Sequence, residues 1–489
     1  MEIIGDKAGE RVNMERETKN YDPYKRTILF FASLVNIILM TLIFAYAWYG
    51  YYASTMFQIT FYRKGHYALL ALYALLMFFF STMYGGLKIG QLRRIEVMLS
   101  QYLSLVFTNI VAYFIICLLA FGIVSPTYLF LVLLAEMVVS TIWNVIIIYF
   151  YNRIFQPWKI LLIYGERPAA DLVYKVEARR DKYAIYDAIN IDEGIDAIAE
   201  KMKSFQAVII GDISAIKRND ILKYCYAHKV RAYVIPKVSD IILMGADRIH
   251  VFDTPFLLSK GYTLSFDQRL AKRALDLMIA VPLTVILSPV MLLTALAIRL
   301  YDRGPVFYKQ VRCTKYNREF EIIKFRSMIV NAESDGVAKL ASENDSRITP
   351  IGHFIRATRI DELPQLLNII RGDMSFVGPR PERPEIIREY CEDMPEFNFR
   401  TRVKAGLTGF AQVYGKYNTT PYDKLKLDLF YIENYSFWMD LKLILMTVKT
   451  VLKKDATEGV AEGQVTAQKE DSGQDQESVE EIVKEIVRK

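Results

Sequence analysis

Long apolar runs dominate the first third of the chain. Each run is close to the roughly 20 residues that an α-helix needs to cross about 30 Å of hydrocarbon. The runs are apolar on all faces and follow one another in series, which argues against buried core helices of a soluble protein. The pattern therefore predicts a membrane α-helical bundle of four helices over residues 27–152. The runs themselves occupy residues 28–50, 67–87, 103–124 and 127–150.

Basic residues predict the orientation of this bundle. Lys and Arg lie before the first run, after the second and after the fourth, and such clusters favour the cytoplasmic side. Arg63 and Lys64, in the first external loop, argue against this orientation with less weight. Residues 1–26 lack the basic-then-apolar plan of a cleavable signal peptide, so we expect a cytoplasmic N-terminal segment.

Residues 157–255 have a different pattern, in which short β-rich runs alternate with helical patterns. This predicts a small cytoplasmic α/β domain with a parallel, doubly wound (Rossmann-like) sheet. Such domains often bind nucleotides at a glycine-rich first turn. Here the turn at 164–168 has one glycine, and Glu166 would face the phosphates. A structural or oligomerisation role is therefore favoured over a nucleotide site.

An apolar stretch at residues 277–298 lies near the start of the last folded region, 268–454. Pro289 removes a helix hydrogen bond, so we expect a kink at Ser288 and Pro289. A re-entrant helix would keep the basic residues at both ends in the cytoplasm, whereas a fifth crossing helix would leave one pair outside. We therefore predict a mainly α, membrane-associated domain with a re-entrant helix. The flanking basic residues are Lys272, Arg273, Arg299 and Arg303.

The end of the chain carries two further patterns. Apolar residues and lysines mix from Trp438 to Lys454, which suits a helix in the head-group layer and equally a helix packed on a core. Residues 455–489 are rich in Glu, Gln, Asp and Gly, and this composition predicts a disordered tail. A short charged helix at 477–489 is compatible with its last stretch.

Composition narrows the class of protein. The 489 residues are 53% hydrophobic and carry a net charge of +7, which fits a protein that meets anionic lipid head groups or phosphorylated substrates. A nucleic-acid-binding protein usually has a denser basic stripe. The four histidines and four cysteines stand in no ligand or nucleophile motif, and no Walker loop occurs, so a zinc hydrolase or an ATP-driven transporter is not supported.

Two adjacent carboxylates, Asp361 and Glu362, are the first candidate catalytic residues. Pro364 disfavours helix geometry at Leu363 and suits the first turn of a helix, so the pair is predicted at the start of the next helix. Anions are favoured there, which suits a carboxylate nucleophile and a phosphoryl group, and Glu362 could hold a divalent metal. An Asp N-cap followed by an ordinary Glu explains the motif equally well.

Four arginines lie in short turn-like segments near apolar runs. Guanidinium groups pair bidentately with phosphate oxygens, so all four are candidate substrate-phosphate ligands. Prolines on both sides of Arg380 stiffen its backbone and fix its direction. Surface arginines, or arginines on lipid head groups, are the alternative, and Arg312 stays undecided. The four candidates are Arg326, Arg356, Arg359 and Arg380.

These motifs, in this order, resemble the bacterial sugar transferase family, the monotopic polyprenyl-phosphate glycosyl-1-phosphate transferases. The resemblance covers 268–454, and the four helices and α/β domain ahead of it are similar to long-form members. One departure is Arg312-Cys313-Thr314, where members usually carry an Arg, Gly or Ala-rich turn. The motifs are Gly304–Arg312, Lys324–Met328, Arg356–Leu366, Gly372–Glu382 and Lys404–Gly415.

The resemblance implies a reaction and roles for its residues. Asp361 would attack the sugar phosphate of a UDP-sugar, expel UMP and carry the phosphosugar until undecaprenyl (polyprenyl) phosphate takes it. Glu362 would bind Mg²⁺, with Mn²⁺ as the alternative, and Ser288 and Pro289 would form the kink of a re-entrant helix. The implied phosphate ligands are Lys324, Arg356, Arg359 and Arg380.

The resemblance also implies a location and partners. We expect a multi-pass protein of the bacterial inner membrane, in contact with lipids and homo-oligomeric, as a dimer, without nucleic acid. It would start synthesis of an exopolysaccharide, capsule or O-antigen from a glucose, galactose or N-acetylated hexose donor. The alternatives are a non-catalytic scaffold or export partner and a polytopic transporter; the latter needs more spanning helices with polar residues at mid-membrane, which we do not find in the sequence.

Overall fold

The computed structural model describes residues 22–55, 63–165, 169–261, 263–330, 347–415, 419–452 and 479–488. The chain divides into two compact units. The first comprises Met1–Ile235 with Asp475–Lys489, and the second comprises Pro236–Gln474. Most of the predicted N-terminal segment, residues 1–21, lies outside the described residues.

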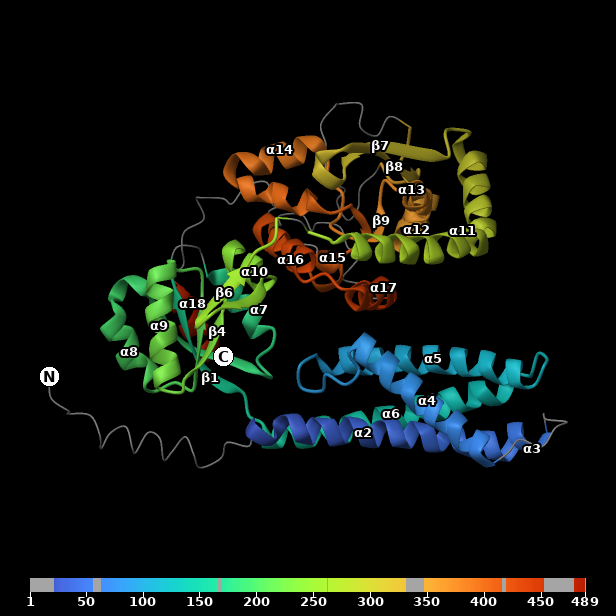
Figure 1. Cartoon of the computed structure of the whole chain (residues 1–489), viewed down its shortest axis with the longest axis horizontal. Helices are drawn as coiled ribbons and strands as arrows, with labels where there is room; N and C mark the ends of the chain where they lie inside the picture. The colour runs from blue at the N-terminus through green and yellow to red at the C-terminus, as the bar shows by residue number, and fades with distance from the viewer. Residues whose placement is uncertain are drawn as a thin grey trace. The chain divides into compact units, whose positions relative to one another are not determined.

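Four long apolar helices form part of the first unit (Figure 1). Each is long and apolar enough to cross a membrane, as the hydrophobic pattern predicts. The first continues through a π-helical turn, Trp48–Tyr52, into the short α3, Ala53–Thr55. The four helices are α2 (Asp22–Ala47), α4 (Arg63–Tyr84), α5 (Arg94–Leu119) and α6 (Thr127–Ile154).

Buried polar side chains join three of these helices. Glu136 of α6 accepts hydrogen bonds from Tyr73 of α4 at 2.5 Å and from Asn109 of α5 at 2.7 Å. Gln101 and Ser140 form a second pair at 2.6 Å between α5 and α6. The prediction that the runs are apolar on all faces is therefore wrong for α5 and α6. These groups bond to one another, so they hold the helices together.

A four-stranded parallel sheet forms the rest of the first unit, as the alternating pattern predicts. The strand order is β2-β1-β3-β4, and helices cover both faces. Ile163 and Val208 pack with α8 and α9 on one face, while Ile160 and Leu162 pack with α7 on the other. The strands are β1 (Trp158–Tyr164), β2 (Tyr183–Asn190), β3 (Ala207–Ile210) and β4 (Arg231–Val234), and the helices are α7 (Ala170–Glu177), α8 (Ile195–Met202) and α9 (Ala215–Ala227).

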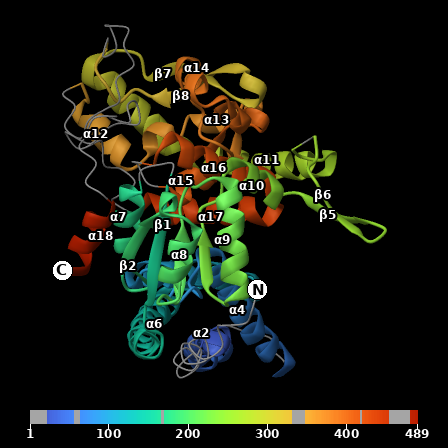
Figure 2. The ribbon, with the colours of Figure 1, turned by 90° about the vertical axis from the view of Figure 1, so that its left-hand side faces the viewer.

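The C-terminal helix α18, Val479–Arg488, packs on the same face as α7 (Figure 2). Ile482 and Val483 are buried there, so the predicted disorder of 455–489 is wrong for this helix. The rest of that range, 455–478 and Lys489, lies outside the described residues. The face of the sheet that carries α7 needs this second helix to cover its apolar side chains.

The boundary between the units falls at Ile235, inside the predicted range 157–255. The reason is that α10, Val238–Met244, buries Ile241 in the core of the second unit. An antiparallel hairpin follows it, formed by β5 (Asp247–Val251) and β6 (Thr254–Leu258).

The second unit surrounds one apolar core that includes Leu366, Phe376, Phe397 and Leu429. Its only regular sheets among the described residues are two-stranded: β5 with β6, the antiparallel β7 with β8, and the parallel β9 with β10. The elements after the first hairpin are α11 (Phe266–Asp302), β7 (Phe307–Cys313), the 3₁₀ turn η3 (Lys315–Asn317), β8 (Glu319–Phe325), α12 (Pro350–Ala357), the 3₁₀ turn η4 (Ile360–Glu362), α13 (Gln365–Arg371), β9 (Ser375–Val377), α14 (Pro384–Asp393), η5 (Pro395–Arg402), β10 (Gly406–Thr408), α15 (Phe410–Tyr414), α16 (Pro421–Glu433) and α17 (Phe437–Val451).

Both ends of α11 are fastened to the rest of the second unit. Near its start, Lys272 is buried and donates to Asp440 at 2.7 Å, and Arg273 donates to the carbonyl of Ile369 at 2.7 Å. At its end, Ile298 packs on Phe325. Figure 1 draws α11 with a pronounced bend, and the helix contains Pro282 and Pro289. Lys272 and Arg273 therefore anchor the helix to the protein, a role that their basic character alone did not predict.

Candidate active site

The predicted carboxylate pair lies in the turn η4, just before Pro364 and α13. Arg359, which precedes the turn, has a positive φ of 59°, an uncommon conformation for a residue with a side chain. The Oδ1 atom of Asp361 is buried without a hydrogen-bond partner among the described residues. A capping role would give a carboxylate oxygen amide donors, so this arrangement does not resemble an ordinary N-cap.

Glu362 is surrounded by cations from three segments. Its Oε1 atom lies 3.1 Å from Arg380 Nη2, 3.3 Å from Lys324 Nζ and 3.9 Å from Arg359 Nη1. Burial alone would raise the pKa of Glu362, but Lys324, Arg380 and Arg359 outweigh it and hold the pKa well below its usual range. Glu362 is therefore ionised at every physiological pH.

Asp361 has the opposite environment. Burial and the negative charge of Glu362 raise the pKa of Asp361 to about 6, against the opposing charges of Lys324, Arg359 and Arg356. Neighbouring carboxyl groups with widely separated pKa values are typical of catalytic pairs with different roles. The two residues of the motif are thus chemically distinct.

The predicted phosphate ligands separate into two groups. Lys324, Arg359 and Arg380 gather at Glu362, and Arg356 adds its charge near Asp361. Arg326 instead pairs with Asp302 at the end of α11, where it packs against Gly304. Ser288 and Pro289 lie within α11, and the Ser288 hydroxyl donates to the Val285 carbonyl at 2.7 Å. The structure therefore brings together four of the five predicted phosphate ligands.

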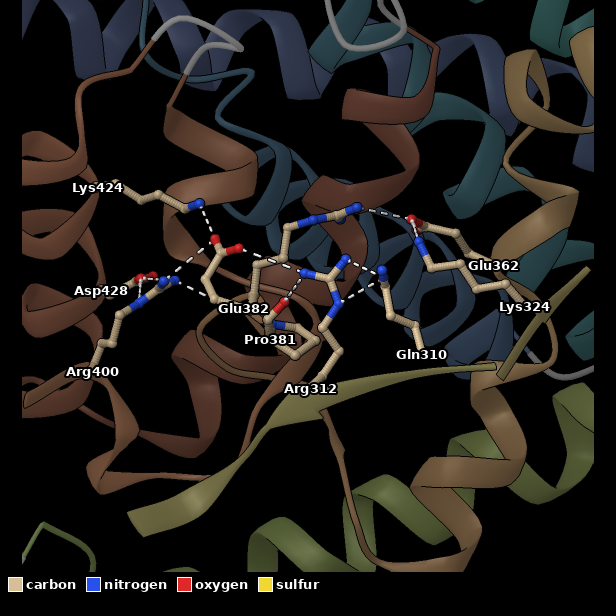
Figure 3. A network of polar contacts seen from close by, with 10 residues as sticks. Gln310, Arg312, Lys324, Glu362, Pro381, Glu382, Arg400, Lys424 and Asp428 are labelled. Carbon is tan, nitrogen blue, oxygen red and sulfur yellow. Dashed lines mark hydrogen bonds and ion pairs between the residues drawn. The ribbon is translucent and has the colours of Figure 1, made fainter. Parts of the chain in front are cut away.

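A second charged cluster adjoins the first and was not predicted as a unit (Figure 3). Glu382 accepts from Lys424 and lies near Arg400 and Arg312, and Arg400 pairs with Asp428. Burial would raise the pKa of Glu382, but Lys424, Arg400 and Arg312 lower it to about 2. Glu382 could have been suspected because it ends the Gly372–Glu382 motif. Two of its partners, Lys424 and Arg400, stand in segments without a motif, so only the folded chain reveals them.

A small cavity lies between the two clusters. Its lining includes three cationic side chains, and it also includes the apolar side chains of an isoleucine and a leucine. A cavity with this lining suits an anionic group attached to a less polar one. The residues are Arg312, Lys324, Arg380, Ile322 and Leu407.

Asp361 and Glu362 could hold a metal ion together with a bound substrate, but they do not enclose one by themselves. The described residues contain no group of three or more His, Cys, Asp or Glu side chains arranged to hold an ion. Mg²⁺ commonly takes one or two carboxylates and completes its shell with phosphate oxygens and water. Glu362 and the unpartnered Oδ1 of Asp361 fit that pattern.

Comparison with known proteins places this geometry in context. A family model described as "Bacterial sugar transferase" matches residues 267–454. The chain is 42% identical over 184 residues to a UDP-N-acetylgalactosamine-undecaprenyl-phosphate N-acetylgalactosaminephosphotransferase of Aeromonas hydrophila; the match covers 37% of this chain and 43% of that protein.

Two further relatives are named UDP-glucose:undecaprenyl-phosphate glucose-1-phosphate transferase. The protein from Caulobacter vibrioides is 41% identical over 191 residues, and the match covers 38% of this chain and 71% of that protein. The protein from Escherichia coli K12 is 38% identical over 209 residues, with 42% and 43% covered. The chain thus matches less than half the length of the Aeromonas and Escherichia proteins.

Proposed function

Because this chain belongs to the bacterial sugar transferase family, we propose that it transfers a sugar-1-phosphate from a UDP-sugar to undecaprenyl phosphate and releases UMP. The supporting observation is the buried, unpartnered Oδ1 of Asp361 beside the cations that gather at Glu362. A carboxylate nucleophile needs a lone pair that no hydrogen bond occupies, and a diphosphate needs positive charge next to it.

The proposed transfer has two steps. An oxygen of Asp361 attacks the phosphorus attached to the sugar, and the bond from this phosphorus to the bridging oxygen breaks, so that UMP leaves with the bonding pair. An oxygen of undecaprenyl phosphate then attacks the same phosphorus and displaces the Asp361 carboxylate. The products are a lipid diphosphate sugar and the original enzyme.

The surrounding side chains stabilise charge during these steps. Lys324, Arg359 and Arg380 are placed to donate to the diphosphate oxygens, while Glu362 keeps them oriented in the free enzyme. A Mg²⁺ ion held by Glu362 and Asp361 would neutralise charge on the leaving UMP. We expect Arg356 to act through its charge at Asp361.

We further propose that α11 is re-entrant and that the site faces the cytoplasm. Support comes from the two ends of α11, which both pack on the second unit through Lys272 and Ile298. Trp438 and Leu452 of the α17 region expose apolar surface that suits the head-group layer. A site level with the head groups could receive UDP-sugars from the cytosol and a lipid phosphate from the bilayer.

We propose that the α/β domain is Rossmann-like and has a structural role. The dimer stays a prediction. A side chain at Gly165, in the turn after β1, would lie 2.7 Å from Ile191 and 3.1 Å from Ile213. Two apolar residues thus fill the place where a phosphate would approach in a nucleotide-binding domain.

A burst experiment without lipid tests the covalent step. Purified protein with Mg²⁺ and radiolabelled UDP-glucose, UDP-galactose or UDP-N-acetylhexosamines should release up to one UMP per site and retain label from its own donor. Undecaprenyl phosphate should then transfer the label to lipid. Asp361→Asn should abolish both, whereas Asp393→Asn, at an exposed position of α14, should not. Normal turnover by Asp361→Asn would show that the nucleophile is another group, and a scaffold would release no UMP.

A further inference from the structure

Every carbonyl group of the segment Pro379–Glu382 accepts a hydrogen bond from another part of the second unit. Two donors are backbone amides and two are guanidinium groups. Proline cannot donate from its nitrogen, so the carbonyls are the main points at which this backbone can be held. From the first carbonyl to the fourth, the donors are Gly406 N at 2.9 Å, Arg400 Nη2 at 3.1 Å, Arg312 Nη1 at 3.3 Å and Cys313 N at 2.9 Å.

Arg400 connects this segment with α16. Its Nε and Nη2 atoms donate to Asp428 Oδ2 at 3.0 and 2.7 Å, and its Nη1 atom lies 3.4 Å from Glu382 Oε1. The side chains of Arg400 and Asp428 are only 2% and 1% exposed. One guanidinium group therefore touches Asp428, Glu382 and the carbonyl of Arg380 at the same time.

Stability alone gives a weak reason for this arrangement. Burying two charges is costly, and apolar residues of similar volume often stabilise a protein as well or better. An apolar side chain at position 400 could not donate to the Arg380 carbonyl. The position of that carbonyl matters because Pro379 and Pro381 make the backbone stiff, so a displacement there is passed on to the Arg380 side chain.

We propose that Arg400 is a positioning residue of the transfer: it fixes the backbone at Arg380 and so directs the Arg380 guanidinium to Glu362 and to a donor phosphate. The Arg380 guanidinium lies 3.1 Å from Glu362 Oε1. Arg400 instead contacts the segment at the Arg380 carbonyl and touches no atom of Asp361 or Glu362. Asp428 holds Arg400 in turn. The inference rests on the proposed function, because it assigns Arg400 to that same site.

A double-mutant cycle separates positioning from general stability. Arg400→Lys keeps the charge but replaces the planar fork of five donors with a single ammonium, which cannot reproduce the contacts of Nε, Nη1 and Nη2 together. We expect it to lower the rate of UMP release about 10- to 100-fold, as displaced binding groups do. In an Arg380→Ala background the same change should cost less than about 2-fold, because the group that it positions is gone. Equal losses in both backgrounds would overturn the proposal.

Two more variants keep the test decisive. Arg402→Lys changes a neighbour on η5 that is 43% exposed and lies 3.9 Å from Glu433, so it should leave UMP release unchanged. If Arg400→Lys fails to fold, Asp428→Asn takes its place in the test, because it preserves the shape of the side chain. The loss of UMP release that Asp428→Asn causes should also vanish in the Arg380→Ala background. An additive loss would again reject positioning. Absence of a UMP burst from the wild type would instead reject the proposed function itself.

Discussion

The sheet of the first unit and the turn η4 of the second both present a site where phosphate could bind, yet they differ in chemistry. After β1, Gly165 packs against Ile191 and Ile213, and the position is apolar. At η4, Glu362 is held by cations from β8, from the residue before the turn, and from the Pro379–Glu382 segment. At the described residue of its first turn, the sheet therefore presents apolar side chains, whereas η4 gathers charge. Function is better inferred from the side chains of a site than from the architecture that carries them.

After the loss of Asp361 itself, the largest effect should come from removing the charge of Glu362. Glu362→Gln leaves Lys324, Arg359 and Arg380 without their shared anion, and we expect UMP release to fall on the order of 10²-fold. The midpoint of the pH–rate profile should also move to lower pH, because the charge of Glu362 helps to raise the pKa of Asp361. Rates measured from pH 4.5 to 8 check both.

A matched carboxylate offers the control for this variant. Glu321 pairs with Lys309 at 2.9 Å on the exposed hairpin of β7 and β8, where both side chains are more than half exposed. Glu321→Gln should leave the rate and its pH profile unchanged. If Glu362→Gln retained full activity, the charged cluster at η4 would have no part in the transfer.

A charge introduced into the apolar core beneath α18 should lower the stability of the first unit and leave UMP release unchanged. Ile482→Asp puts a carboxylate on the buried face of α18, at a cost of about 3 kcal/mol. The first unit should therefore unfold at a lower temperature, measured by thermal proteolysis, while UMP release at 20 °C stays as in wild type. Lys484→Asp, on the exposed side of the same helix, is the control. Unchanged unfolding in Ile482→Asp would show that α18 contributes nothing to this core.

Patterns of nearby residues predict the features of the structure that depend on neighbours in the sequence. The apolar helices and the strands follow from runs and alternation, and the pair Asp361 and Glu362 follows from its motif. The tail was misjudged because its Glu and Lys content hides apolar residues at helical spacing, a signal that was present in the sequence. These residues are Val479, Ile482, Val483 and Ile486.

The contacts that orient the site could not be predicted in this way. Arg400 and Asp428 are 28 residues apart, and Lys324 and Glu362 are 38 apart. Their meeting depends on how α16, η5 and β8 pack around a common core, and no periodicity records it. Arg326 is the opposite case. Its motif resembles those of the phosphate ligands, but its side chain pairs with Asp302 at the end of α11.

The smallest expected effect on the rate comes from protonation of Asp361, which distinguishes this carboxyl group from the ionised Glu362. The groups that face Asp361 are Glu362, Lys324, Arg359 and Arg356, and together with burial they raise its pKa to about 6. The attacking form is the anion, so UMP release at pH 5 should be about 10-fold slower than at pH 7. A profile that stays flat down to pH 5 would show that protonation of Asp361 does not limit the transfer.

The same shift has a consequence for stability with a definite sign. A carboxyl group whose folded-state pKa is raised favours the folded state below its unfolded pKa, 3.8, and loses that contribution as pH rises through about 6. Ionised Asp361 therefore opposes folding at pH 7, and Asp361→Asn should unfold at a higher temperature than wild type there. The difference should shrink at pH 5, where wild-type Asp361 is mostly protonated. Thermal unfolding of both proteins at the two pH values measures it, and a variant less stable at pH 7 would show that the negative charge of Asp361 is favoured by its cationic neighbours.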